Sequence, residues 1–238
     1  NVANLMNQVI KKKNTEFILG LGDNIYPFGV KSTEDKQFIN KFEKPYESLP
    51  NNIKFYQVLG NHDYFGNIKA QIDYQDNLNR WQLPNNYYYF DKILNGVRVE
   101  FYAIDTNLYY DHRLLDKAVE QESYMFDKLN QSRDENCWRI IYGHHPWKST
   151  GFHGHCNELL NSFLKKMSET KKIHLYISGH DHDNQHIYER SNPESPHILV
   201  SGTGAKLRYI PKTYRDIKSY YYDNYLLHYS ENPGFITL

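Results

Sequence analysis

The sequence predicts an α/β (α+β) domain in which two mixed β-sheets pack face to face and are flanked by helices. Helical and strand-like periodicities alternate from the N-terminus, polar residues follow four apolar strands, and short strands fill the last third. The chain has 238 residues, of which 39% are hydrophobic, so it is long enough for one sizeable core. We therefore expect a single domain over residues 1–238.

The first part of the chain alternates helical and extended patterns. Apolar side chains at i, i+3 and i+4 spacing predict a helix over residues 2–13. Apolar runs predict strands over 17–21 and 53–59, and helical periodicity predicts helices over 33–48 and 68–79. This order is typical of βα units.

The middle of the chain begins with a predicted antiparallel hairpin. Residues 87–90 and 97–104 are its strands, and Asn95-Gly96 is typical of a tight two-residue turn. Two helix-and-strand units follow, at 117–132 with 139–142 and at 157–169 with 173–177.

The last third predicts only short strands. They lie at 187–189, 198–200 and 235–237 and are separated by Pro, Asn and Gly. The polar, aromatic loop over 206–224, which includes Tyr220, Tyr221 and Tyr222, carries no recognisable pattern.

Composition argues against several classes of partner. The 28 basic and 28 acidic side chains cancel, so there is no electrostatic basis for binding nucleic acid. No apolar run approaches the ~20 residues needed to span a bilayer. Cys137 and Cys156 are too few for a disulfide framework, and we expect two thiols. We also expect a monomer.

Polar residues follow four of the predicted strands at the point where each strand ends. The four blocks are Gly22-Asp23, Gly60-Asn61-His62, Gly143-His144 and Gly179-His180-Asp181-His182. An aspartate in this position is by itself more often a turn former or a helix cap. Four such blocks together predict a metal centre, in which the two oxygens of Asp23 can bridge two cations.

The residues around these blocks refine the prediction. Tyr26 offers a phenolate that suits Fe(III), although one tyrosine of 22 at a given offset is usually a packing residue. Asn61 offers an amide oxygen, and the neighbouring His62 points elsewhere and can act on a substrate. His180 and His182 are spaced i, i+2 and project to the same side in extended backbone.

Other polar residues receive more ordinary interpretations. His144 is the predicted ligand of its block, and His145 is a structural or substrate-side histidine. Asp105 is interpreted as a turn cap before Thr106-Asn107. The remaining histidines have no partner pattern and are interpreted as ordinary core or surface residues: His112, His174, His186, His197 and His228.

With these blocks in place, the chain resembles the purple acid phosphatases, most closely the small animal-type, tartrate-resistant branch of the metallophosphoesterase superfamily. The likeness covers nearly the whole chain and includes the context of the motifs, at residues 17–24, 66–72 and 179–184. It implies a metallophosphoesterase-type sandwich and a secreted or endolysosomal location. Tyr26 separates this group from related phosphoprotein phosphatases, nucleases and cyclic phosphodiesterases.

The resemblance also implies roles for individual residues. Asp23 would bridge the metals, Tyr26 and His182 would bind Fe(III), and Asn61, His144 and His180 would hold Fe(II), Zn(II) or Mn(II). His62 and His153 would bind phosphate or protonate the leaving group. The implied activity is acid hydrolysis of phosphate monoesters by attack of a metal-bound hydroxide.

Three departures from the family pattern leave alternatives open. The first Asp-x-Gly motif has no counterpart because the chain opens at Asn1, so we expect a domain that lacks the first strand and part of the C-terminal strand. The iron site is then one carboxylate short. Cys156 matches a family cysteine, but the segment after Asp105 lacks its partner. The alternatives are a non-catalytic scaffold or binding protein and a phosphodiesterase with two divalent metals.

Overall fold

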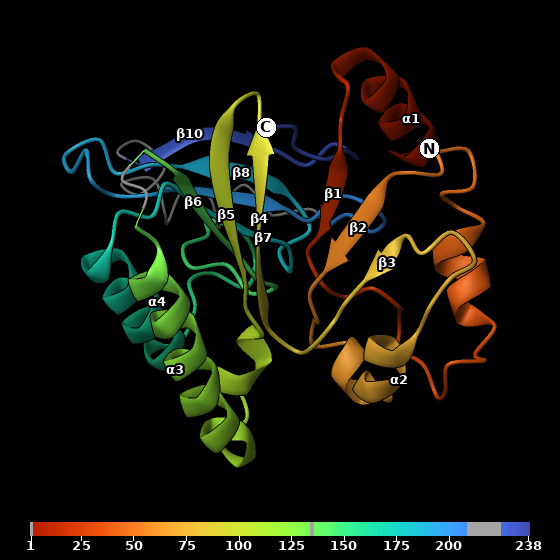
Figure 1. Ribbon diagram of the computed structural model, residues 1–238, viewed down its shortest axis with the longest axis horizontal. Coiled ribbons are helices and arrows are strands. Elements are labelled where there is room, and N and C mark those ends of the chain that lie inside the picture. The colour runs from red at the N-terminus through yellow and green to blue at the C-terminus, as the bar shows by residue number, and fades with distance from the viewer. Residues whose placement is uncertain (1, 134–135, 209–224) are drawn as a thin grey trace.

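Two β-sheets form the centre of the structure, a computed structural model that describes residues 2–133, 136–208 and 225–238 (Figure 1). The smaller sheet has the strand order β1-β2-β3 and the larger has the order β10-β8-β9-β7-β6-β5-β4. The strands are β1 (Phe17–Gly20), β2 (Lys54–Gln57), β3 (Trp81–Gln82), β4 (Tyr88–Leu94), β5 (Val97–Ala103), β6 (Trp138–Tyr142), β7 (Leu175–Ser178), β8 (Asn184–Ile187), β9 (His197–Ser201) and β10 (Leu226–Ser230). The predicted fold class of two sheets flanked by helices is confirmed.

Helices flank the sheets. The α-helices are α1 (Val2–Lys13), α2 (Ile68–Asp73), α3 (Leu115–Gln131) and α4 (Glu158–Thr170). Helices α3 and α4 lie side by side against the larger sheet, whereas α1 and α2 lie near the smaller one (Figure 1). The side chains of Asn67 and Asn157 cap α2 and α4 by accepting backbone N–H bonds. In the described part of the chain, no helix is long and apolar enough to cross a membrane.

Strand alternation divides the apolar residues of the larger sheet between two cores. Phe101 and Ile140 face the cluster that fills the space toward the smaller sheet, and their neighbours Tyr102 and Ile141 face the opposite cluster. Apolar residues of α3 and α4 complete that second cluster, namely Ala118, Met125, Leu129, Leu160, Phe163, Leu164 and Met167. The larger sheet is therefore buried on both faces.

Parallel pairing brings the ends of several strands to common edges. Strands β1, β2 and β3 are parallel, so the smaller sheet is parallel rather than mixed. In the larger sheet β5, β6, β7 and β9 run parallel, and β4 joins β5 through the predicted hairpin. Asn95 (φ 50°) and Gly96 (φ 82°) both have positive φ, as the turn chemistry predicts.

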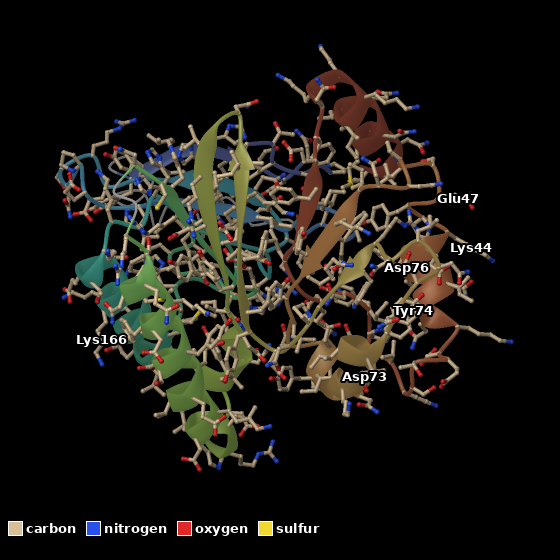
Figure 2. All side chains as sticks on the ribbon, viewed as in Figure 1. Lys44, Glu47, Asp73, Tyr74, Asp76 and Lys166 are labelled. Carbon is tan, nitrogen blue, oxygen red and sulfur yellow. The ribbon has the colours of Figure 1, made fainter. Side chains whose placement is uncertain are left out.

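Two of the predicted helices are wrong in length. In place of a helix over 33–48, the structure is helical only over residues 37–43, of which Ile39–Glu43 are π-helical, and Pro45 lacks the N–H that continued helix needs. Helix α2 ends at Asp73 rather than at 79, because Tyr74 turns extended and stacks on Phe38 at 3.6 Å between ring centroids. Figure 2 shows Tyr74 and Asp76 beside the segment that carries Lys44 and Glu47.

The C-terminal strand prediction is also wrong. Residues 235–237 form no strand, because Phe235 and Ile236 contribute side-chain packing to the main core without a ladder of backbone hydrogen bonds. The edge strand is instead β10, which pairs antiparallel with β8. Strand β8 begins at Asn184, earlier than the predicted 187, and the two-residue β3 was not predicted. Most of the unassigned loop, including Tyr220–Tyr222, lies outside the described residues.

Two neighbouring leucines of α4 provide a matched test of this packing. Leu160 is fully buried and Leu159 is 51% exposed. We expect Leu160→Ala to lower the free energy of unfolding by about 2–5 kcal/mol, since it leaves a cavity between α4 and the sheet. Leu159→Ala is expected to change it by about 0.5 kcal/mol or less. Urea unfolding followed by circular dichroism measures both, and equal losses would contradict the assigned face of α4.

Candidate metal centre

The predicted ligands meet where the two sheets present the carboxyl ends of their parallel strands. Asp23 follows β1, Asn61 follows β2, His144 follows β6 and His180 follows β7. Each of these strands ends in a short loop that begins with or contains glycine. The structure thus brings together four side chains that are far apart in the sequence.

Asp23, Tyr26 and His182 form one half of this cluster, the Tyr26 half. The Tyr26 hydroxyl donates to Asp23 Oδ2 at 2.7 Å and lies 3.2 Å from His182 Nε2. Asn61, His144 and His180 form the other half, the His144 half. His144 Nε2 lies 3.0 Å from Asn61 Oδ1, 3.0 Å from His180 Nδ1 and 3.4 Å from Asp23 Oδ1. Asp23 therefore touches both halves, one through each carboxylate oxygen.

The hydrogen bonding of His144 shows that the His144 half suits a cation. His144 Nδ1 lies 2.8 Å from the Leu21 carbonyl oxygen, so this nitrogen carries the proton and donates it. In the neutral ring Nε2 then carries a lone pair. This nitrogen faces the side-chain oxygens of Asn61 and Asp23, which are also acceptors. Lone pairs that converge in this way fit a positive ion, and the backbone bond at Nδ1 is the arrangement found behind metal-bound histidines.

Burial keeps two histidines of the cluster in the neutral state that a metal ligand requires. Burial, followed by the neighbouring His144, lowers the pKa of His180 to about 2, and burial followed by Arg208 lowers the pKa of His182 to about 4. Both rings are therefore neutral at neutral pH. Burial and the adjacent Asp23 raise the pKa of Tyr26, so its hydroxyl ionises only if a strong positive charge is placed beside it.

The backbone at the cluster is strained. Asp23 (φ 53°) and His180 (φ 64°) are non-glycine residues in the left-handed region. Gly22 also has a positive φ of 82°, and a Cβ there would lie 2.8 Å from His144 Nδ1. Such backbone costs of order 1–3 kcal/mol per residue and persists where surrounding structure enforces it, often at functional sites.

Asp63 holds the two ligand loops of the smaller sheet together. It is fully buried and accepts from the backbone N–H groups of Gly60 (2.8 Å), Asn24 (3.1 Å) and Ile25 (3.2 Å). Gln71 of α2 donates a fourth bond at 3.0 Å. Asp63 therefore fixes the loop carrying Asp23 and Tyr26 against the loop carrying Asn61 and His62.

Three further histidines surround the cluster. The His62 ring lies 4.4 Å from that of Tyr26, and its Nδ1 is 2.6 Å from the Pro27 carbonyl oxygen. The rings of His145 and His153 lie 4.5 and 4.2 Å from that of His180. His145 is buried and its Nδ1 is 2.7 Å from Thr106 Oγ1, so it is tied to the protein as well as close to the site.

Sequence reasoning missed Arg208. Its Nη1 lies 2.7 Å from His153 Nε2, and its guanidinium carbon is 4.5 Å from the centre of the Phe152 ring. Its backbone N–H donates to the His182 carbonyl oxygen at 3.3 Å. In the sequence Arg208 is only a basic residue in an unassigned loop, and nothing there distinguishes it from any other arginine.

Sequence reasoning also missed a pair of neighbouring carboxylates, Asp181 and Asp183. Asp181 is fully buried, accepts from the His153 N–H at 2.8 Å and is hydrogen-bonded by the Ser149 hydroxyl. Burial and the charge of Asp181 raise the pKa of the neighbouring Asp183 to about 7, while Gln185 bonds its Oδ1 at 2.7 Å. This network holds the loop that presents His153.

The remaining sequence interpretations have mixed outcomes. Asp105 caps the turn Thr106–Tyr109 by accepting the Asn107 N–H at 3.0 Å, as predicted. His186 and His197 instead pair with each other at 2.8 Å between β8 and β9, a contact that the sequence does not indicate. Cys137 and Cys156 are both thiols, as predicted.

A cavity of about 1320 Å³ leads to the cluster from α1. Its lining includes Phe17–Gly20 of β1 together with Leu199, Phe235 and Ile236. Asp23, Tyr26, His144, His180 and His182 also line it. Five of the six predicted ligands are therefore accessible from this space.

Comparison with known proteins identifies related sequences. A profile of the calcineurin-like phosphoesterases matches residues 1–184. The chain is 30% identical to Purple acid phosphatase 7 of Arabidopsis thaliana, over all of this chain and 73% of that protein. It is 33% identical to Purple acid phosphatase 4 of the same plant and 30% identical to Tartrate-resistant acid phosphatase type 5 of Sus scrofa. These two matches cover 86% and 82% of this chain but only 63% and 60% of the relatives.

Solved structures share the fold at lower identity. The Plasmodium protein described as GAP50, the anchor in the inner membrane complex, superposes with a TM-score of 0.77 at 23% identity, over 98% of this chain and 73% of that one. The purple acid phosphatase PPD1 of yellow lupin superposes with a TM-score of 0.60 at 15% identity, over 97% of this chain and 43% of that one. These likenesses support the fold alone.

A metal-content experiment tests the His144 half. We expect His144→Ala to weaken binding of a metal ion at the His144 half by at least about 10–100-fold. A loss of that size already follows when only the hydrogen-bond partner of a metal ligand is removed. His186→Ala is the matched control, because His186 lies outside both halves of the cluster and its ring contacts that of His197. Metal content after dialysis, measured by inductively coupled plasma mass spectrometry, reads out both. Equal content in the two variants would exclude His144 as a ligand.

Proposed function

The chain belongs to the calcineurin-like phosphoesterase family and resembles its purple acid phosphatases, and from this premise we propose that it is a binuclear acid phosphatase that hydrolyses phosphate monoesters. The single observation that supports this proposal best is the convergence of the Tyr26 half and the His144 half on the shared carboxylate of Asp23. Two adjacent donor sets with one bridging group are what a metal pair needs.

The donor sets suggest which ion each half holds. Tyr26 and His182 with Asp23 would hold Fe(III), because only a high positive charge offsets the burial that disfavours the phenolate. Asn61, His144 and His180 with Asp23 would hold Fe(II), Zn(II) or Mn(II), which accept mixed nitrogen and oxygen ligands. When bound, the metals supply Lewis-acid activation of water and of the phosphoryl oxygen.

The histidines that are not ligands divide the remaining work. The Nδ1–H group of His62 donates a hydrogen bond to the Pro27 carbonyl oxygen. The other ring nitrogen, Nε2, is then left to exchange a proton with the leaving oxygen. His153 Nε2 accepts from Arg208, so His153 orients that guanidinium. Arg208 in turn carries a permanent charge and a planar fork suited to phosphate oxygens. We therefore assign proton transfer to His62 and substrate binding to Arg208 with His153.

Two alternatives make different predictions. A scaffold is conceivable from the fold, since a solved relative of similar fold is described as an anchor. Packing alone gives no reason, however, for left-handed backbone at both Asp23 and His180, or for buried acceptors that face one another. A diesterase with two divalent metals would not depend on Tyr26. Metal binding accounts for the strained backbone, and the contact of Tyr26 with Asp23 favours the phosphatase over the diesterase.

Replacement of His62 tests the proposal. We expect His62→Ala to lower kcat for a simple phosphate monoester by about 10²–10⁴-fold, the usual contribution of a proton-transfer group. Metal content is expected to stay unchanged, because His62 lies outside both donor sets. The matched control is His112→Ala, which removes an exposed histidine of the turn His112–Leu114.

Three results, from the wild-type protein and from two variants, would count against the proposal. Metal-loaded wild-type protein that hydrolyses no monoester would favour the scaffold. A preference for diesters that survives Tyr26→Phe would favour the diesterase. Full activity of His62→Ala would refute the role of His62.

Arg208 allows a second test, directed at substrate binding. We expect Arg208→Gln to raise KM and the inhibition constant of inorganic phosphate about 10-fold or more, since a charged hydrogen bond contributes about 1.5–3 kcal/mol. Arg208→Lys keeps the charge and is expected to recover part of the affinity. Arg190→Gln, at an exposed arginine in the turn after β8, is the control. An unchanged phosphate inhibition constant in Arg208→Gln would exclude Arg208 from the phosphate site.

A further inference from the structure

Each of the three histidines that surround the metal centre without belonging to it contacts an exposed aromatic ring. The ring-centroid distances are 5.7 Å for His62 and Phe65, 4.1 Å for His145 and Tyr110, and 5.3 Å for His153 and Phe152. The three rings come from three separate segments of the chain. A shared position beside the site therefore does not follow from their position in the sequence.

These rings are open to solvent. Phe65 is 64% exposed, Phe152 is 54% exposed and Tyr110 is 46% exposed. Phe28, which is 68% exposed, extends the group because its ring lies 6.1 Å from that of Phe65. We call these four side chains the aromatic rim. Exposed apolar surface that gathers in one region commonly marks a binding site.

The rim accounts for almost all exposed aromatic side chains in the described part of the chain. Among the large hydrophobic side chains that are exposed there, the aromatic ones are Phe28, Phe65, Tyr110, Phe152 and Trp138. Trp138 begins β6, whereas His144 follows the other end of that strand, so Trp138 lies away from the site. If these aromatic side chains were exposed by chance, we would not expect them to gather around the candidate metal centre.

Two rings of the rim are held in position. The Arg208 guanidinium lies over the Phe152 ring at 4.5 Å, and Tyr110 stacks on His145 with an angle of 22° between the ring planes. The Tyr110 hydroxyl also accepts the Asn157 N–H at 3.3 Å. Rings that are already oriented lose less conformational entropy when a ligand binds.

We propose that the aromatic rim is a leaving-group subsite, which selects phosphate monoesters whose leaving group carries a planar aromatic ring. The inference rests on the proposed function. In the proposed function Arg208 binds the phosphoryl group and His62 exchanges a proton with the leaving oxygen, so the rings that contact His62 and His153 are those that the leaving group would meet. Stacking against one or two rings is expected to give about a 3- to 10-fold preference over a saturated group of similar size.

The test compares benzyl phosphate with cyclohexylmethyl phosphate. Both esters release a primary alcohol of similar size, so the main difference between them is the flat ring. We expect metal-loaded wild-type protein to show a kcat/KM ratio of about 3–10 in favour of the benzyl ester. Phe65→Leu and Phe152→Leu keep an apolar side chain but remove the ring, and their double variant is expected to bring the ratio close to one.

Trp138→Leu is the matched control, since it removes an exposed ring, 51% exposed, that stacks on His174 instead. Its ratio is expected to equal that of the wild type. Binding of benzylphosphonate and cyclohexylmethylphosphonate, measured by calorimetry, provides the same comparison without turnover. Thermal unfolding of each variant verifies that the exposed substitutions leave the fold intact.

The outcomes separate the two proposals. A wild-type ratio near one, or a ratio that the double variant leaves unchanged, overturns the subsite. If the rim instead serves a protein partner, the ratio is near one as well. If neither ester is hydrolysed but benzylphosphonate binds more tightly and loses this advantage in the double variant, the proposed hydrolysis fails while the subsite stands.

Discussion

The site depends on the placement of one carboxylate, that of Asp23. Its Oδ2 accepts from Tyr26 and its Oδ1 lies 3.4 Å from His144 Nε2, so a single side chain joins donors from the smaller and the larger sheet. This position requires left-handed backbone at Asp23 and close approach of Gly60, where an added Cβ would lie 2.2 Å from Asp23 Oδ1. Gly60 is thus explained by the space that the carboxylate occupies.

Two buried carboxylates support this arrangement in the same way. Asp63 follows His62 and collects backbone N–H groups from the loops after β1 and β2, and Asp181 follows His180 and accepts the N–H of His153. In each motif a residue that faces the site alternates with an acid that anchors a loop behind it. Both acids are fully buried, and the hydrogen bonds that they accept satisfy oxygens that burial removes from water.

The sequence predicts the part of the site that is carried by strand ends. Asp23, Asn61 and His144 each follow an apolar run, and the polar residue after such a run marks the carboxyl end of a strand. Arg208 and the anchoring role of Asp181 could not be predicted, because they depend on contacts between loops distant in sequence. Likewise, the helix expected over 33–48 had the right apolar spacing, but Pro45 cannot continue a helix and the helical segment ends at Glu43.

This difference has a consequence for what sequence can reveal about function. The donors of the metal centre sit on strand ends whose positions follow from the fold, so the class of chemistry can be predicted from motifs. The groups proposed to surround the substrate, such as Phe65, Phe152 and Arg208, lie in loops or short turns between those strands. Their spacing obeys no period, and only their meeting around His62 and His153 gives them a common role. The proposed substrate preference therefore depends on tertiary structure, while the proposed type of reaction can be inferred from the order of residues.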